Sequence, residues 1–154
     1  LIYHHHMERI KSANIMMSLQ PAFNYVWNHL TYYEWVDRER AHTVDPLKTW
    51  TLHNVPIAGG SDSTVTDLAP LLGIHAAVNH SREEERLNIQ EALELFTSGV
   101  AYSSFDEEKR GRLETGLQAD ITVLKDNPLT TDPTSLKDIP ILMTIVDGAI
   151  VFER

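Results

Sequence analysis

The stretch Ile57-Ala58-Gly59-Gly60-Ser61-Asp62-Ser63 contributes most to a prediction of the fold. An apolar run, residues 55–58, predicts a short strand, and two glycines end it just before Asp62. In a β/α barrel, catalytic side chains lie at the carboxyl ends of strands, which is where Asp62 stands. The glycines let the backbone approach a ligand closely. The alternative is that Asp62 caps a turn or helix, and the local pattern by itself favours that alternative.

Helical and strand patterns alternate on both sides of this stretch. Residues 15–19 predict a buried strand that Gln20-Pro21 ends. Asp45-Pro46 predicts the start of a helix that runs to about Asn54, with Asp45 as its cap. Residues 70–80 have a helical spacing of apolar side chains. The aromatic-rich segment 24–40 fits either short helices or a long loop.

The pattern changes after the polar, turn-rich segment 103–112. Before it, residues 88–101 carry an apolar stripe that predicts one long helix. After it, residues 121–124 favour a strand, and residues 141–152 predict a hairpin with an Asp147-Gly148 turn. The expected fold class is therefore α/β, with a parallel unit over residues 1–105 and a small β element over 106–154.

Composition narrows the classes of function. The chain has 154 residues, 42% of them hydrophobic and 23% charged, which is typical of one globular domain. Thirteen basic and 22 acidic residues give a net charge of −9, which argues against nucleic acid and anionic membranes as partners. There is no cysteine, so disulfides and thiolate zinc sites are excluded. Any metal must be bound by nitrogen and oxygen ligands.

The amino-terminal segment raises separate questions. Residues 1–7 lack the basic start and the apolar length of a signal peptide, and the chain has no apolar run of about 18 residues. We therefore expect a cytoplasmic protein. The run His4-His5-His6-Met7 fits either a purification-tag remnant before a start methionine or native sequence.

Histidines and acidic runs are the other candidates for chemistry. His4 follows the apolar residues 1–3 and so fits the end of a strand. The remaining isolated histidines are more often surface or core-edge residues than metal ligands: His29, His42, His53, His75 and His80. The run Glu83-Glu84-Glu85 is typical of a solvated face.

Three blocks of sequence, in this order, resemble the metal-dependent amidohydrolase superfamily, and most closely its amidohydrolase family 3 branch. The first block covers residues 59–65 and 69–78, and it contains Gly-Gly-Ser-Asp-Ser-Thr-Val. The second covers residues 91–97 and 99–101, and the third covers residues 111–124 and 126–128. Residues 17–21 look like the seventh barrel strand of the family. The resemblance extends over nearly the whole chain.

The resemblance implies a fold and a site. The fold is the C-terminal part of a TIM-like (β/α)8 barrel, about strands 6–8, followed by a segment of a small β-sandwich. Asp62 matches the metal-binding and catalytic aspartate of strand eight, and His4 is the match to the histidine ligand of strand six. The cofactor implied is a divalent metal, zinc first and iron or manganese as alternatives.

The chemistry implied is hydrolysis of non-peptide C–N bonds, in amides or cyclic amides, by a metal-activated water. A carboxylate such as Asp62 takes a proton from that water and returns it to the leaving nitrogen. A barrel needs about 250 residues, so we expect a C-terminal portion that is inactive alone. The alternative is a noncatalytic structural or oligomerisation module. In either case, open strand edges predict a homo-oligomer. If the chain is part of a hydrolase, its expected partner is a small-molecule substrate.

Overall fold

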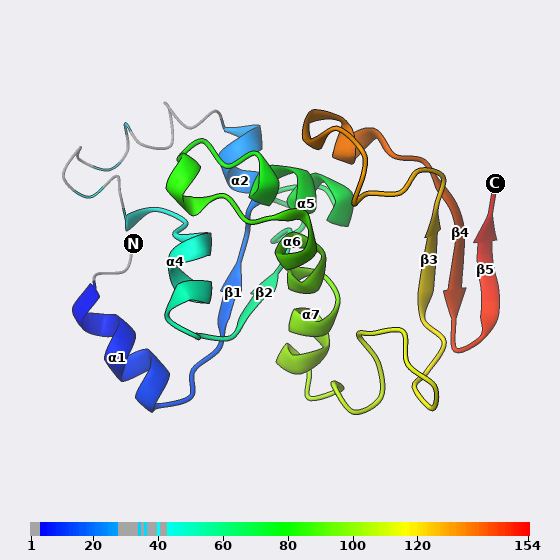
Figure 1. Ribbon diagram of the computed structural model, residues 1–154, viewed down its shortest axis with the longest axis horizontal. Helices are drawn as coiled ribbons and strands as arrows, with labels where there is room; N and C mark the ends of the chain where they lie inside the picture. Colours follow the sequence, from blue (N-terminus) through cyan, green and yellow to red (C-terminus); the bar gives the residue numbers. More distant parts are fainter. Residues whose placement is uncertain (1–3, 28–33, 35, 37–39, 41–42) are drawn as a thin grey trace.

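The computed structural model describes residues 4–27, 34, 36, 40 and 43–154, with only the backbone of His4 and His5 (Figure 1). Its first half alternates helix and strand: α1 (His4–Ser12), β1 (Met17–Leu19), α2 (Ala22–Val26), α4 (Leu47–Leu52), β2 (Ile57–Gly59) and α5 (Pro70–Val78). A 3-10 turn, η2 (Glu83–Glu85), then leads to α6 (Ile89–Leu95) and α7 (Ser98–Ser103). The second half holds β3 (Ile121–Leu124), η3 (Pro133–Asp138), β4 (Ile141–Val146) and β5 (Ala149–Glu153).

The two short strands predicted from residues 15–19 and 55–58 pair in parallel. In the described part of the chain, β1 and β2 form a two-stranded sheet in which Leu19 stands opposite Gly59. Gly60 N–H donates to Leu19 O over 2.8 Å, which extends the pairing by one step. Parallel pairing requires a long crossover, and the chain between Leu19 and Ile57 provides it. The carboxyl ends of both strands therefore lie side by side.

Helices cover this sheet and bury the core. One cluster of buried side chains joins α4, α5 and α6, through Leu47, Ile74, Ala77, Leu87, Ala92 and Leu95. A second cluster packs α1 and α4 beside the strands, through Met7, Trp50 and Val55. Each of these residues is at most 4% exposed. The apolar spacing that predicted residues 70–80 as helix is thus confirmed by α5, with Pro70 in its first turn.

The long helix predicted over residues 88–101 is instead two helices. Asn88 begins α6 with a capping box that it forms with Glu91, and the helix ends at Phe96. Helix α7 then packs against β2 so closely that a Cβ on Gly99 would lie 2.5 Å from Ile57 O. One straight helix cannot follow both surfaces, so the chain turns at Thr97.

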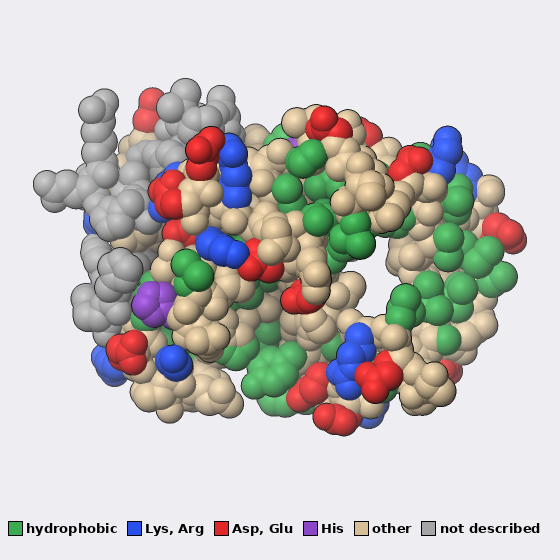
Figure 2. All heavy atoms as spheres, in the orientation of Figure 1, with side chains coloured by type: hydrophobic (Ala, Val, Ile, Leu, Met, Phe, Trp, Pro, Cys, Tyr) green, Lys and Arg blue, Asp and Glu red, His purple; other side chains and the backbone are tan. Residues whose placement is uncertain are grey.

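Strands β3, β4 and β5 form an antiparallel sheet in that order. The predicted hairpin is confirmed: Asp147 and Gly148 join β4 to β5 with φ of 51° and 78°, the backbone of a tight hairpin turn. Apolar side chains gather over this sheet (Figure 2), and those of β5 are exposed, with Val151 at 61%. The mixed α/β class is as predicted. The division at residue 105 remains a prediction.

Helix α5 connects the two halves. Pro133 O, at the start of η3, accepts a hydrogen bond from Asn79 Nδ2 over 2.8 Å and lies 3.2 Å from Nδ1 of His75. Leu136 of η3 is 1% exposed.

Among the described residues, none of the helices has the length and apolar character that a membrane span requires.

Two local predictions were wrong. Asp45 does not cap α4: Pro46 is the residue before that helix, no side chain caps it, and Asp45 contacts Asn24 instead. The run of three glutamates is not uniformly solvated, because Glu85 is 4% exposed. Its carboxylate accepts hydrogen bonds from the backbone N–H and the hydroxyl of Thr49. In both cases a partner distant in sequence determines the environment of the side chain.

Candidate functional site

The paired carboxyl ends of β1 and β2 open into two loops. The first passes through Gln20 and Pro21 into α2, and the second, residues 60–69, leads into α5. Main-chain groups at the ends of parallel strands and the loops that follow them form the usual site region of α/β folds. Asp62 lies in the second loop, three residues after β2 ends.

Asp62 is exposed and its backbone is left-handed, with a φ of 51°. Such a conformation is uncommon outside glycine, although aspartate tolerates it better than most residues. Asp62 O accepts a hydrogen bond from Val65 N–H over 2.7 Å, so residues 62–65 form a tight turn. The loop thus presents a carboxylate to solvent at the end of a strand, as the sequence predicted. The catalytic and metal-binding roles of Asp62 stay predictions.

His4, the second predicted metal ligand, is the first residue of α1 rather than the last residue of a strand. Its side chain, with residues 1–3 before it, lies outside the described residues. Within the described part of the chain, no three or more His, Asp or Glu side chains are grouped as a metal site. His29 and His42 are outside the described residues as well.

Two of the remaining histidines, which the sequence favours as surface or core-edge residues, have structural partners. His75 is 4% exposed and packs edge-on against Tyr25, with ring centroids 4.9 Å apart. Burial lowers the pKa of its imidazole. His80 is 1% exposed and belongs to a buried polar network. Both are therefore part of the interior, close to the core-edge role that the sequence predicted.

That network joins three segments at the carboxyl side of β1. Asn24 Nδ2, in α2, donates to Asp45 Oδ2 and lies 3.1 Å from His80 Nε2. Burial raises the pKa of Asp45 to about 6, an effect that the hydrogen bond from Asn24 and the charge of Arg82 oppose. Burial, aided by Arg82, lowers the pKa of His80 to about 4. At neutral pH Asp45 is therefore a carboxylate and His80 a neutral imidazole.

The same network continues through charged side chains near η2. Arg82 donates from Nη2 to Val44 O over 2.6 Å, and its Nη1 lies 3.9 Å from Glu85 Oε1. No pattern in the sequence predicts this network. Asp45 precedes a proline and Glu85 ends an acidic run, and both patterns are typical of solvent-exposed caps and faces.

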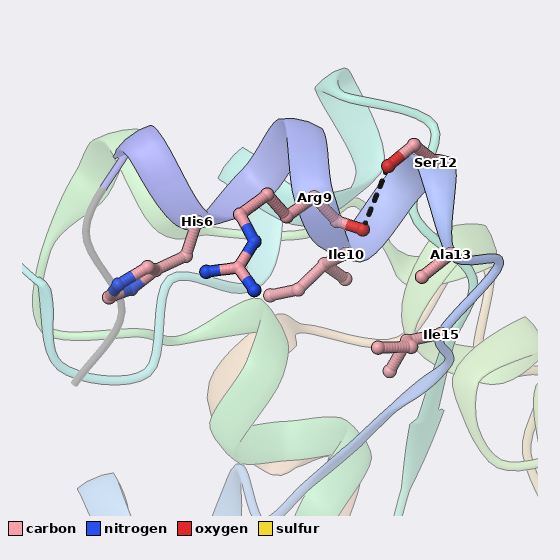
Figure 3. A pocket seen from close by; sticks show the side chains of 6 residues that line it. All are labelled: His6, Arg9, Ile10, Ser12, Ala13 and Ile15. Carbon is pink, nitrogen blue, oxygen red and sulfur yellow. Dashed lines mark hydrogen bonds between the residues drawn. The ribbon is translucent and has the colours of Figure 1, made fainter.

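An open pocket of about 510 Å³ lies along α1 and the turn after it, lined by His6, Arg9, Ile10, Ser12, Ala13 and Ile15 (Figure 3). Figure 3 shows the side chains of His6 and Arg9 extending from the same helix, and Ser12 Oγ donates to Arg9 O over 3.1 Å. Ala13 and Ile15 lie in the connection between α1 and β1, so the pocket is near the amino end of that strand. Asp62 follows the carboxyl end of β2, and the pocket does not contain it.

Comparison with known proteins identifies the family. The sequence pattern of the amidohydrolase family matches residues 3–152. A Bacillus subtilis (strain 168) protein described as "Putative amidohydrolase YtcJ" is 33% identical over 161 residues, which cover 96% of this chain and 30% of that protein. The N-substituted formamide deformylase of Arthrobacter pascens is 23% identical over 155 residues, which cover 96% of this chain and 28% of that enzyme.

A solved structure agrees with these sequences. The crystal structure of an uncharacterised metal-dependent hydrolase from Pyrococcus furiosus superposes with a TM-score of 0.74 and 32% identity, over 84% of this chain and 27% of that one. This chain therefore spans less than a third of the length of each of these relatives. The match over residues 3–152 and the 33% identity to the Bacillus subtilis protein lead to one conclusion: the chain belongs to the amidohydrolase family.

Proposed function

We propose that this chain forms the C-terminal part of a metal-dependent hydrolase that cleaves non-peptide C–N bonds. The observation that carries the proposal is the position of Asp62, exposed in the loop after a parallel strand, in a chain that matches the amidohydrolase family over residues 3–152. In this proposal β1 and β2 are the seventh and eighth strands of a barrel, and α1 follows the sixth. The antiparallel sheet β3–β5 is then the sandwich segment, with the boundary near residue 105.

The described residues do not fit a complete metal site by themselves. They include Asp62, but they contain no group of three or more His, Asp or Glu side chains that could hold a metal ion. The other ligands would come from His4 and from chain that lies outside this sequence, and a bound zinc, iron or manganese would supply Lewis-acid chemistry there. The part that this chain plays is proton transfer. A carboxylate oxygen of Asp62 accepts a proton from the attacking water and returns it to the leaving nitrogen.

The substrate class follows from the relatives and from the charge of the chain. One relative is named for its action on N-substituted formamides, which contain a C–N bond of the proposed kind. The net charge of −9 argues against polyanionic substrates. We infer a small, uncharged or weakly charged amide or cyclic amide as the substrate.

The test uses the longer protein that the chain would complete, made from the sequence that precedes Leu1 in its source. Bound metal is measured by mass spectrometry and turnover is measured on a panel of N-substituted formamides and cyclic amides. Asp62→Asn should lower kcat by about 10²–10⁴, the usual effect of losing a general base. Asp67→Asn is the matched control, because Asp67 is an exposed aspartate of the same loop.

Two results would contradict the proposal. If Asp62→Asn keeps turnover, Asp62 does not carry out the proposed proton transfer. Turnover by the isolated 154-residue chain, lost on Asp62→Asn, would show that no further ligands are needed and would refute the part of the proposal that concerns a fragment.

A second candidate function is noncatalytic self-association. It is favoured by β5, an edge strand whose Ile150 and Val151 side chains are 57% and 61% exposed. Size-exclusion chromatography with light scattering at micromolar concentration tests it. A dimer or larger species is expected, and a monomer would argue against this candidate.

A further inference from the structure

The loop that carries Asp62 contains one buried side chain. Thr66 is 6% exposed, whereas Asp62, Val65 and Leu68 around it are exposed, Leu68 to 82%. A short polar loop would not be expected to bury a hydroxyl unless that hydroxyl had a partner. The partner is Ser61 O, which accepts a hydrogen bond from Thr66 Oγ1 over 2.5 Å.

This hydrogen bond closes the loop around Asp62. Ser61 precedes Asp62 directly, and its neighbour Gly60 is fixed to β1 by the bond to Leu19 O. Ser61 Oγ also accepts a hydrogen bond from Ser63 N–H over 3.2 Å. The residue before Asp62 is thus held on one side by the strand pair and on the other by Thr66.

The turn that follows Asp62 is held in the same way. Val65 N–H donates to Asp62 O over 2.7 Å, and Val65 is the neighbour of Thr66. The bond from Thr66 to Ser61 O therefore spans the turn, because it joins the residue before Asp62 to the residue after Val65. Because the left-handed backbone of Asp62 is a less favoured conformation, it persists only where the surrounding contacts hold it.

We propose that Thr66 is a positioning residue, whose buried hydroxyl holds the Ser61–Asp62 backbone so that the Asp62 carboxylate is fixed in a reactive position. The inference rests on the proposed function, which assigns the proton transfer to Asp62. It adds a residue whose hydroxyl contacts the backbone of the loop. Small displacements of a catalytic group lower the rate strongly, so a loose loop would lower kcat.

The first experiment uses the 154-residue chain and does not depend on activity. Thr66→Val keeps the size and burial of the side chain and removes the hydroxyl. We expect the Val65 amide to exchange with deuterium at least about tenfold faster, as measured by NMR, because a lost hydrogen bond of ordinary strength corresponds to about this factor. Thr66→Ser, which keeps the hydroxyl, should leave the exchange within about twofold of the parent chain.

Thr64→Val is the matched control. Thr64 is an exposed threonine of the same loop, and no hydrogen bond joins its side chain to another described residue. After correction of the intrinsic exchange rate for the changed neighbour, its replacement should leave the exchange of the Val65 amide within about twofold of the parent chain. Equal effects of the two valine variants would overturn the proposal, and so would an unchanged exchange rate in Thr66→Val.

The second experiment measures kinetics in the longer protein. Thr66→Val should lower kcat by about 10 to 10² with KM nearly unchanged, and Thr66→Ser should restore it. If Thr66→Val does not fold, Thr66→Ser alone decides: a parental kcat supports the proposal, and a tenfold loss overturns it. If Asp62→Asn abolishes turnover while Thr66→Val has the parental kcat, only this inference fails. If Asp62→Asn keeps turnover, the proposed function fails, and the exchange rates still decide whether Thr66 holds the loop.

Discussion

Asp45 Oδ2 lies 4.0 Å from His80 Nε2, and the side-chain amide of Asn24 contacts both. The side chain of His80 is fully buried and that of Asp45 is 10% exposed. Three segments that are far apart in the sequence therefore share one polar network: α2, the turn before α4 and the turn after α5. Arg82 and Glu85 are the charged groups that face this network.

The first prediction concerns the charge of Asp45. Burial raises its pKa from 3.8 to about 6, so the ionised carboxylate is less stable in the folded chain than in the unfolded one. Asp45→Asn keeps the shape and an oxygen that can accept from Asn24, and asparagine tolerates the φ of 45° found at this position. At pH 8 we expect the free energy of unfolding to rise by up to about 3 kcal/mol in chemical denaturation.

The stabilisation by Asp45→Asn should depend on pH, because the pKa of Asp45 is higher in the folded chain than in the unfolded chain. As the pH falls from about 6 to 3.8, the folded chain takes up the proton on Asp45 before the unfolded chain does, so the parent chain gains stability. The advantage of Asp45→Asn should therefore shrink through this range and vanish below it. Asp126→Asn, at an exposed position, should have little effect at any pH. An advantage that stays constant with pH would contradict the prediction.

The second prediction concerns His80. Burial lowers its pKa from 6.5 to about 4, so the unfolded chain takes up the proton first as the pH falls. This contribution to stability is complete above pH 6.5 and is lost between about 6.5 and 4. In the parent chain the opposite change at Asp45 masks much of it. The Asp45→Asn variant should reveal it, as a free energy of unfolding that falls by up to about 3 kcal/mol over this range.

The direct measurement is an NMR titration of the His80 ring. Its midpoint should lie near pH 4, where the imidazole gains its charge. A midpoint near the ordinary value of 6.5 would mean that His80 is not buried as described, and the predicted loss of stability should then be absent as well.

The third prediction concerns Glu85. Its carboxylate is 5% exposed and accepts hydrogen bonds from the backbone and hydroxyl of Thr49. Glu85→Ala should leave the two Thr49 donors without a buried acceptor and remove the carboxylate beside Arg82, and so lower the free energy of unfolding by about 2–4 kcal/mol. Glu84→Ala is the control, because the side chain of Glu84 is 68% exposed. The control should change stability by less than about 0.5 kcal/mol. If Glu85→Ala and Glu84→Ala lower the free energy of unfolding equally in a urea titration, the prediction is wrong.

The fourth prediction concerns the contact of Phe96 with two glycines. A Cβ on Gly73 would lie 2.2 Å from Phe96 Cζ, and one on Gly59 would lie 2.6 Å from it. The ring therefore fills the space between α5 and β2 that these glycines leave open. Gly73→Ala should lower the melting temperature, with a loss of about 1–3 kcal/mol despite the better helix propensity of alanine.

Gly60→Ala provides the matched control, because the nearest atom to its added Cβ, Leu19 O, is 3.9 Å away. The control should change stability by less than about 1 kcal/mol. Adding Phe96→Leu to Gly73→Ala should recover part of the loss, so the two changes should not be additive. Strict additivity would show that the ring and the glycine are not in contact.

The sequence by itself determined the local elements, because their signals are local. Short apolar or β-rich runs, helical spacing and turn residues predicted β1, β2, α5, β3 and the hairpin at Asp147-Gly148, and the order of the motif blocks predicted the family. Asp62 became a candidate in the same way, since a strand followed by glycines and a carboxylate is a contiguous pattern, and its role stays a prediction. The match over residues 3–152 confirms the family.

Only the tertiary structure decided which polar side chains are buried and where helices must break. Asp45 and Glu85 have patterns typical of the surface, and their burial depends on Asn24 and Thr49, which are distant in the sequence. The predicted helix over residues 88–101 is interrupted because α7 must approach the backbone of β2 at Gly99. The sequence around Thr66 does not distinguish it from other loop threonines. Only the structure shows that its hydroxyl donates a hydrogen bond to Ser61 O. Hydrogen-bond partners and close contacts of this kind are properties of the folded chain, and no single window of sequence contains them.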